Sequence, residues 1–178
     1  MSERDDLDRM QRDLDRLLAK EQITDALLAY ARGADRIDLD LIRSVFHPGA
    51  TADYGDMFHG TGEGFADFIG EVHPPMQTHT HHLSNIAIQV DGDRAGSECY
   101  VVMRGRTVGE DDAVHDTVSY GRYVDEWQRR DGEWRISHRR YLHSLDEIVA
   151  VTISLFGPNG SRDATDPSYA ALHTDEPT

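Results

Sequence analysis

The sequence lacks the cysteine pairs that form disulfides, the apolar runs that cross a bilayer and the excess of basic residues that binds nucleic acid. Its 178 residues include one cysteine, Cys99, which cannot form an intrachain disulfide and is expected to be a small buried hydrophobe. Basic residues number 18 against 33 acidic ones, and the net charge of -15 argues against nucleic acid and anionic membranes as partners. No apolar run has membrane-spanning or signal-peptide character, so a cytoplasmic protein is predicted.

The N-terminal part of the chain is patterned for helices. Apolar spacing predicts one long helix over residues 1–33, ended by Gly33, with the mostly charged residues 1–12 frayed or projecting. Asp38 is a suitable N-cap for a short second helix whose apolar side extends to Phe46. A third helix is expected over about residues 62–72, before two prolines.

The rest of the chain is patterned for strands. Besides a short strand at 50–54, the pattern predicts strands at 78–90, 94–107, 115–129 and 133–145. Helices followed by an antiparallel meander indicate an α+β fold in one domain, residues 1–148. Residues 149–178 read as a C-terminal extension with one helical turn near Tyr169. A curled sheet covered by helices on one face encloses an apolar pocket suited to a small molecule.

Three segments carry a resemblance to a known family: EQITDALLAYARGADRIDLDLIRSVFHPGATADY, THHLSNIAIQVDGDRA and YVDEWQRRDGEWRISHRRYLHS. They resemble the SnoaL-like family of the nuclear transport factor 2 superfamily, over roughly residues 15–145. Members similar to this chain include scytalone dehydratase, hexachlorocyclohexane dehydrochlorinase and bile-acid 7α-dehydratase. The resemblance implies a cystatin-like cone, and a fold that hosts dehydratases, isomerases, cyclases, epoxide hydrolases and non-catalytic proteins.

The resemblance also implies site residues. In dehydratase-like members, a catalytic aspartate lies just past the first helix and a histidine begins the first long strand; Asp35 and His81 occupy these positions. Tyr30 matches a tyrosine five residues before the aspartate, and Arg139 matches an arginine of the last strand. An acid of the bile-acid enzyme would fall near Met103, so that part of its site is not expected in this chain.

The stretch QTHTHH allows two chemical readings. In a strand, His79 and His81 share a face and His82 points away. As metal ligands, His79 and His81 would need a third partner, for which His115, Asp116 and His143 are the candidates. No compact motif completes that set, so neither a metal nor an organic cofactor is predicted.

The second reading is a proton relay. A carboxylate beside an imidazole fixes its tautomer and orients its ring, and Asp35 is the candidate partner of His81. The alternative is that Asp35 only terminates a helix and that His81 is a structural histidine. Tyr30 would donate to a carbonyl or leaving oxygen, although a core-edge tyrosine is an equal alternative.

Further residues are predicted to bind substrate: Tyr54, Phe68, Met103, Arg139 and His143. Arg139 could hold an oxyanion, but it lies in a basic run for which a solvated face or an ion pair is the commoner role.

The strand that carries the histidines is expected to change faces. Strict alternation places Ile86, Ile88 and Val90 opposite to His81, so the apolar side and the histidine side do not match. A β-bulge near Ser84 and Asn85 would resolve this conflict.

These observations predict a cofactor-independent dehydratase, isomerase or cyclase that acts on a hydrophobic cyclic metabolite. One alternative is a non-catalytic module that binds a small molecule or a protein. The other is epoxide hydrolysis, which needs an Asp–Arg–Asp set for which the sequence offers no convincing second aspartate. The curved sheet is expected to pack into a homodimer or homotrimer.

Overall fold

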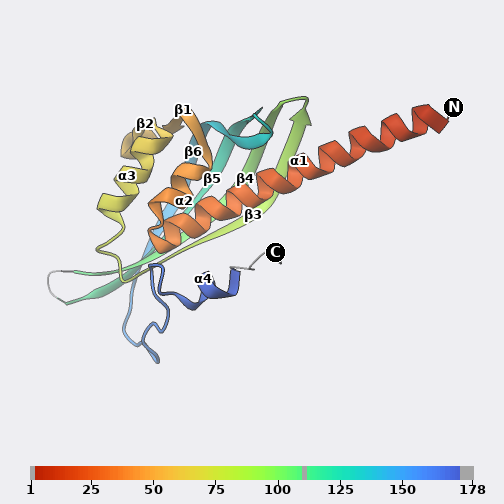
Figure 1. The fold of residues 1–178 in the computed structure, drawn as a ribbon. Coiled ribbons are helices and arrows are strands. Elements are labelled where there is room, and N and C mark those ends of the chain that lie inside the picture. Colours follow the sequence, from red (N-terminus) through yellow and green to blue (C-terminus); the bar gives the residue numbers. More distant parts are fainter. Residues whose placement is uncertain (1–2, 110–111, 173–178) are drawn as a thin grey trace.

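The computed structural model describes residues 3–109 and 112–172, and these form helices packed on a curved sheet (Figure 1). The helices are α1 (Glu3–Arg36), α2 (Leu39–Ser44), α3 (Gly62–Val72) and α4 (Pro167–Leu172). The strands are β1 (Phe46–Asp53), β2 (His59–Thr61), β3 (Thr78–Asp91), β4 (Arg94–Val108), β5 (Val114–Arg130) and β6 (Glu133–Ala150). None of the helices in the described residues combines the length and apolar character that crossing a bilayer requires.

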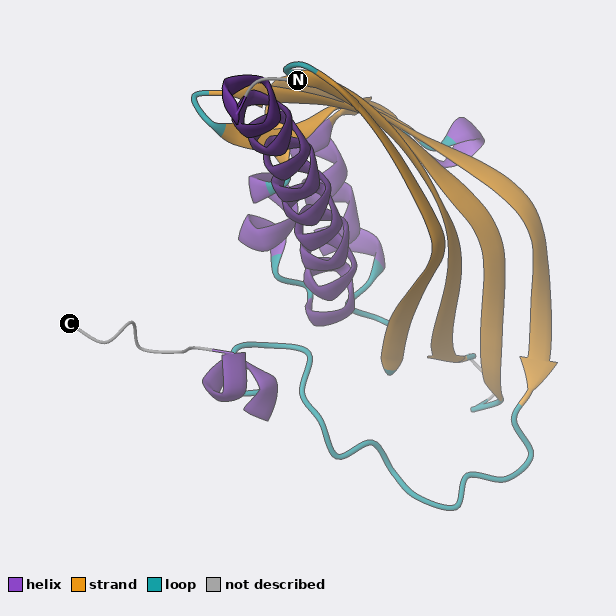
Figure 2. Cartoon of the chain, turned by 90° about the vertical axis from the view of Figure 1, so that its right-hand side faces the viewer, coloured by secondary structure: helices purple, strands orange, loops and turns teal. Residues whose placement is uncertain are grey.

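The six strands of the described residues form one sheet in the order β2-β1-β6-β5-β4-β3. The predicted meander is confirmed, since β3 to β6 pair antiparallel with their neighbours in the chain. β1 joins the sheet parallel to β6. The sheet bends strongly and stays open, with the helices inside the bend (Figure 2). This unclosed α+β arrangement is the predicted cone.

Helix α1 spans the open side of the cone and faces the sheet with a narrow apolar stripe. Ile23 and Leu27 are fully buried on it. The leucines that precede them in the pattern do not share that face: Leu14, Leu17 and Leu18 are 49–61 % exposed. The N-terminal turns of α1 project beyond the sheet (Figure 1), which leaves these leucines without a covering layer.

Gly33 does not end α1 as predicted, because the helix continues to Arg36. The left-handed residue that closes it is Ile37, with φ 53°, and the Asp38 amide then donates to the Gly33 carbonyl at 2.9 Å. Gly33 instead permits close packing, since an added Cβ would lie 2.9 Å from Ile42 Cγ1. Asp35 therefore stands inside the last helical turn.

At the β2–β1 edge of the sheet the structure differs from the sequence prediction in two ways. The second helix ends at Ser44, and Phe46 begins β1 rather than extending the helix, because its buried ring packs in the core beside parallel β6. The three-residue β2 was not predicted, because so short a strand leaves no alternation pattern in the sequence. The third helix, by contrast, has the predicted bounds.

The predicted bulge in β3 is confirmed. Pairing between β3 and β4 shifts register between Ser84 and Ala87, and Asn85 adopts a left-handed φ of 50°. The shift moves the apolar residues that follow onto the face that His81 occupies before it. His79 and His81 therefore face the helices together.

Candidate active site

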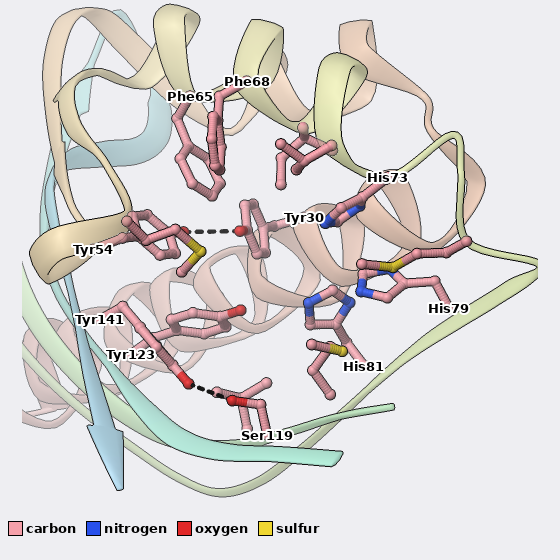
Figure 3. A pocket seen from close by; sticks show the side chains of 16 residues that line it. Tyr30, Tyr54, Phe65, Phe68, His73, His79, His81, Ser119, Tyr123 and Tyr141 are labelled. Carbon is pink, nitrogen blue, oxygen red and sulfur yellow. Dashed lines mark hydrogen bonds between the residues drawn. The ribbon is translucent and has the colours of Figure 1, made fainter. Parts of the chain in front are cut away.

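A cavity of about 310 Å³ lies between α1, α3 and the concave face of the sheet. Its apolar wall comes from both layers: Phe65, Phe68, Ile69 and Val72 from α3, Val101 and Met103 from β4, Met57 from the short 3₁₀ helix Gly55–Met57, and Met76 from the loop before β3. Its polar groups are histidine, tyrosine and serine side chains (Figure 3). Within the described part of the chain, none of the lining residues is an aspartate, glutamate, lysine or arginine.

Asp35 and His81 meet at the wall of this cavity. Asp35 Oδ1 lies 2.8 Å from His81 Nδ1, and the His81 backbone amide donates to Asp35 Oδ2 at 3.1 Å. The last turn of α1 thus supplies the carboxylate, and the start of β3 supplies the ring. Because Nδ1 is engaged by the carboxylate, Nε2 is the nitrogen available to exchange a proton with a bound molecule. His81 itself lines the cavity, whereas Asp35 stands behind it.

Tyrosine hydroxyls occupy the middle of the cavity. Tyr30 and Tyr54 share a hydrogen bond of 2.8 Å between their hydroxyls, and the Tyr30 and His81 ring centroids are 6.4 Å apart. Burial raises the pKa of Tyr30 and raises that of Tyr54 well above its ordinary value. Both hydroxyls therefore stay protonated near neutral pH and can donate to a substrate oxygen.

Strands β5 and β6 contribute polar groups that the sequence reasoning did not select. Ser119, Tyr123 and Tyr141 line the cavity, and Ser119 Oγ lies 3.3 Å from the Tyr141 hydroxyl. Ser119 and Tyr123 are four residues apart on β5, so alternation places them on one face, and Tyr141 lies directly opposite Tyr123; that cross-strand pairing, which the sequence alone did not supply, completes the group.

The predicted site residues therefore divide into two groups. Tyr54, Phe68 and Met103 join Tyr30 and His81 around the cavity. His143 lies outside the lining and pairs with Asp146 at 3.1 Å on an exposed stretch of β6. His143 therefore does not reach the cavity for which substrate binding was predicted.

Arg139 also lies outside the lining, in the core behind it. Its guanidinium is 0 % exposed and donates to both carboxylate oxygens of Asp125 at 2.7 Å. The rings of Tyr30 and Tyr123 both contact it, each with its centroid 4.2 Å from Arg139 Cζ, and pack edge-to-face against one another with centroids 5.5 Å apart. This pair supports the tyrosines of the cavity wall from behind. An Asp–Arg–Asp set around a cavity water is therefore not assembled among the described residues, which disfavours epoxide hydrolysis.

Metal ligation has a geometric basis at one place in the described chain. One ligand atom each from Asp35, His79 and His81 lie within 4.8 Å of one another. A carboxylate with two imidazoles is a donor set that suits several transition metals. Asp35 and His81 are, however, already at hydrogen-bond distance from one another. Their arrangement is therefore explained by a direct carboxylate–imidazole hydrogen bond and does not need a metal ion between them.

The C-terminal extension reaches the site from outside. It leaves β6, runs across the open end of the cone and places α4 beside the end of α1 (Figure 2). Arg162 donates to the carbonyl oxygens of Asp35 at 3.2 Å, His73 at 3.1 Å and Met76 at 2.7 Å. The Tyr169 hydroxyl adds a bond of 2.9 Å to Asp38 Oδ2. Arg162 thus ties the turn that carries Asp35 to the loop before β3.

Replacing Arg162 with alanine is expected to release the extension. A hydrogen bond from a charged donor contributes about 1.5–3 kcal/mol, and a loss of about 1.4 kcal/mol is a tenfold change in a local equilibrium. Amide exchange at residues 161–172 should therefore accelerate about tenfold or more, as measured by hydrogen exchange with mass spectrometry. Arg130→Ala, which removes an exposed arginine of the β5–β6 hairpin, is the control and should change nothing in this segment. Equal exchange in the wild type and Arg162→Ala would show that other contacts hold the extension.

Comparison with known proteins places this geometry in a family. The model of the SnoaL-like domain matches residues 15–140. Among solved structures, a hexachlorocyclohexane dehydrochlorinase LinA-type3 from Novosphingobium barchaimii aligns with a TM-score of 0.69 at 23 % identity, covering 82 % of this chain and 99 % of that one. A scytalone dehydratase-like protein from Novosphingobium aromaticivorans aligns with a TM-score of 0.66 at 21 % identity, covering 82 % and 95 %.

A third solved structure, an ntf2-like protein with a cystatin-like fold from Novosphingobium aromaticivorans, aligns with a TM-score of 0.65 at 22 % identity, covering 77 % of this chain and 89 % of that one. These structural similarities describe the fold. No curated protein sequence matches the chain. The family model covers most of the chain, and its bounds include α1, the cavity and the Asp35–His81 pair. The chain therefore belongs to the SnoaL-like domain family.

Proposed function

We propose that the protein is a cofactor-independent lyase that removes water from an uncharged, hydrophobic cyclic compound. The contact between Asp35 and His81 at the wall of an apolar cavity carries this proposal. Imidazole is the side chain best suited to take and return a proton near neutral pH. The names of two structural neighbours, a dehydrochlorinase and a scytalone dehydratase-like protein, support an elimination reaction.

The reaction follows from the placement of the groups. A substrate with a carbonyl group and a hydroxyl on the β-carbon enters the cavity, and His81 Nε2 removes the proton from the carbon between them. Tyr30, kept protonated by burial, donates to the carbonyl oxygen as negative charge develops there. The electron pair then forms the C=C bond while the C–O bond breaks. Hydroxide leaves with the proton of the imidazolium, so one water is lost and His81 returns to its starting state.

The same first step also serves isomerisation, if the proton returns to another carbon, and cyclisation, if the carbanion attacks a carbonyl. Dehydration is favoured because one imidazole can both remove the proton and protonate the leaving group. The tyrosine and serine hydroxyls are the remaining polar groups that could hold the departing oxygen.

The test is a solvent-exchange assay on the intact protein. Uncharged cyclic β-hydroxyketones are incubated with the protein in D₂O, and NMR follows deuterium uptake beside the carbonyl and appearance of the unsaturated ketone. We expect both signals for at least one compound that binds in the cavity. Compounds that bind at saturation without exchange or elimination would contradict the proposal and favour a non-catalytic binding module.

A further inference from the structure

Two histidines of the cavity wall have no part in the proton transfer. His73 caps the C-terminus of α3, and His79 is the second residue of β3. Their ring centroids are 4.0 Å apart, and that of His79 is 4.6 Å from that of His81. Figure 3 shows the three rings together at one end of the cavity, with Tyr54, Tyr123 and Tyr141 toward the other.

His79 is buried without satisfying its polar atoms. It is 3 % exposed, and neither ring nitrogen has a hydrogen-bond partner within the described residues. Asp35 Oδ1 lies 3.8 Å from His79 Nδ1, which is beyond hydrogen-bond distance, and that oxygen is already engaged by His81. A buried polar group without a partner costs about 1–3 kcal/mol. Both nitrogens are closed to solvent as the ring stands, but the ring lines the cavity, so a half-turn about its Cβ–Cγ bond would present a nitrogen to a molecule bound there.

The protonation state of these rings defines what they can bind. Burial lowers the pKa of His79 to about 2 and that of His73 to about 4, and the cations nearby act in the same direction. Both imidazoles are therefore neutral near pH 7. A neutral imidazole offers one N–H donor and one acceptor, as a hydroxyl does, so the two groups are complementary. A carboxylate or phosphate would find no cation among the lining residues that the structure describes.

We infer that His79, with His73 beside it, forms a second polar subsite that binds a hydroxyl group of the substrate, separate from the carbon that reacts at His81. The substrate class is thus an uncharged ring compound with a hydroxyl distant from its reacting carbonyl. The orientation of this substrate rests on the proposed function, whereas recognition of the hydroxyl does not. The subsite acts through binding and has no role in moving the proton.

The test compares ligands that differ in one hydroxyl. 1-Tetralone and its ring-hydroxylated isomers are titrated into the wild-type protein, and dissociation constants are measured by calorimetry. We expect at least one hydroxylated isomer to bind about tenfold more tightly than 1-tetralone, which corresponds to about 1.4 kcal/mol. In His79→Leu this advantage should disappear, and in His79→Gln, whose amide keeps a donor and an acceptor, part of it should return.

Matched variants separate this inference from its rivals. His82→Leu makes the same replacement on the opposite face of β3 and should keep the hydroxyl preference. His79→Leu should unfold at the same temperature as the wild type or higher, because an unsatisfied polar group is replaced by an apolar one. Asp35→Asn should keep the preference while losing turnover, so failure of the subsite and failure of the lyase mechanism give different results.

Three outcomes would overturn the inference. Hydroxylated isomers that bind the wild type no better than 1-tetralone would remove the subsite. A preference that survives in His79→Leu would place the hydroxyl elsewhere. Stoichiometric zinc or iron in protein purified without chelator, lost together in His79→Leu and His81→Ala, would assign the unsatisfied nitrogens to a metal.

Discussion

Replacing Asp35 with asparagine is expected to lower the turnover number by about 10²–10⁴-fold, the usual contribution of general acid–base catalysis. The amide keeps the shape of the side chain but loses the charge that stabilises the imidazolium of His81 during the reaction. It can also donate to Nδ1, which would put the proton on Nε2 and block that nitrogen as a base. The Michaelis constant should change little, because Asp35 does not line the cavity.

The measurement uses the substrate found in the solvent-exchange assay, with turnover recorded across pH 5 to 9. His81→Ala should show a loss of the same size, and the double variant should be no worse than either single one, because the two side chains act as a unit. His82→Ala, on the other face of β3, is the matched control and should retain wild-type turnover. Turnover within threefold of the wild type in Asp35→Asn would rule out the pair as the catalytic base.

The second large effect concerns stability. Replacing Asp125 with asparagine is expected to lower the free energy of unfolding by about 3–5 kcal/mol, because the fully buried Arg139 would lose its counter-ion. The two residues face one another in the β5–β6 register, and both guanidinium bonds to the carboxylate measure 2.7 Å. A buried cation cannot recover that interaction from water.

Urea unfolding followed by tryptophan fluorescence measures this effect, since Trp127 lies in the core near the pair. Glu98→Gln is the matched control, because it breaks a cross-strand pair with Arg122 that is partly exposed to solvent. It should cost about 0–1 kcal/mol. Equal costs for the two variants would show that the buried pair contributes no more than a surface pair does.

The contact between Asp35 and His81 could be predicted because each residue has a local signal in the sequence and both match the family resemblance. Asp35 follows the apolar stripe of a helix, and His81 begins a strand at a fixed spacing from Asn85. Alternation placed His79 and His81 on one face, and the conflict with the later apolar residues located the bulge correctly. Whether the pair catalyses proton transfer stays a prediction, as does the expected homo-oligomer.

The residues whose roles were predicted wrongly or not at all are positioned by contacts between segments that lie far apart in the sequence. The basic run around Arg139 gives no sign that its middle member faces Asp125, because that register includes a shift at Glu126 and Trp127. His73 carried no motif, and it became part of the site because the loop after α3 returns beside β3. Gly33 was predicted to end the first helix, which is the commonest local role of a glycine at such a position. Its close approach to Ile42 depends instead on how α2 packs against α1.

The docking of Arg162 on the Asp35 carbonyl has a consequence for how the protein is made. Synthesis proceeds from the N-terminus, so α1 and the first long strand leave the ribosome well before Arg162 does. Arg162 follows β6 in the chain, so every strand of the cone precedes the residue that braces the helix end. Folding in the order of synthesis would therefore bring Asp35 and His81 together before the backbone beside them is restrained.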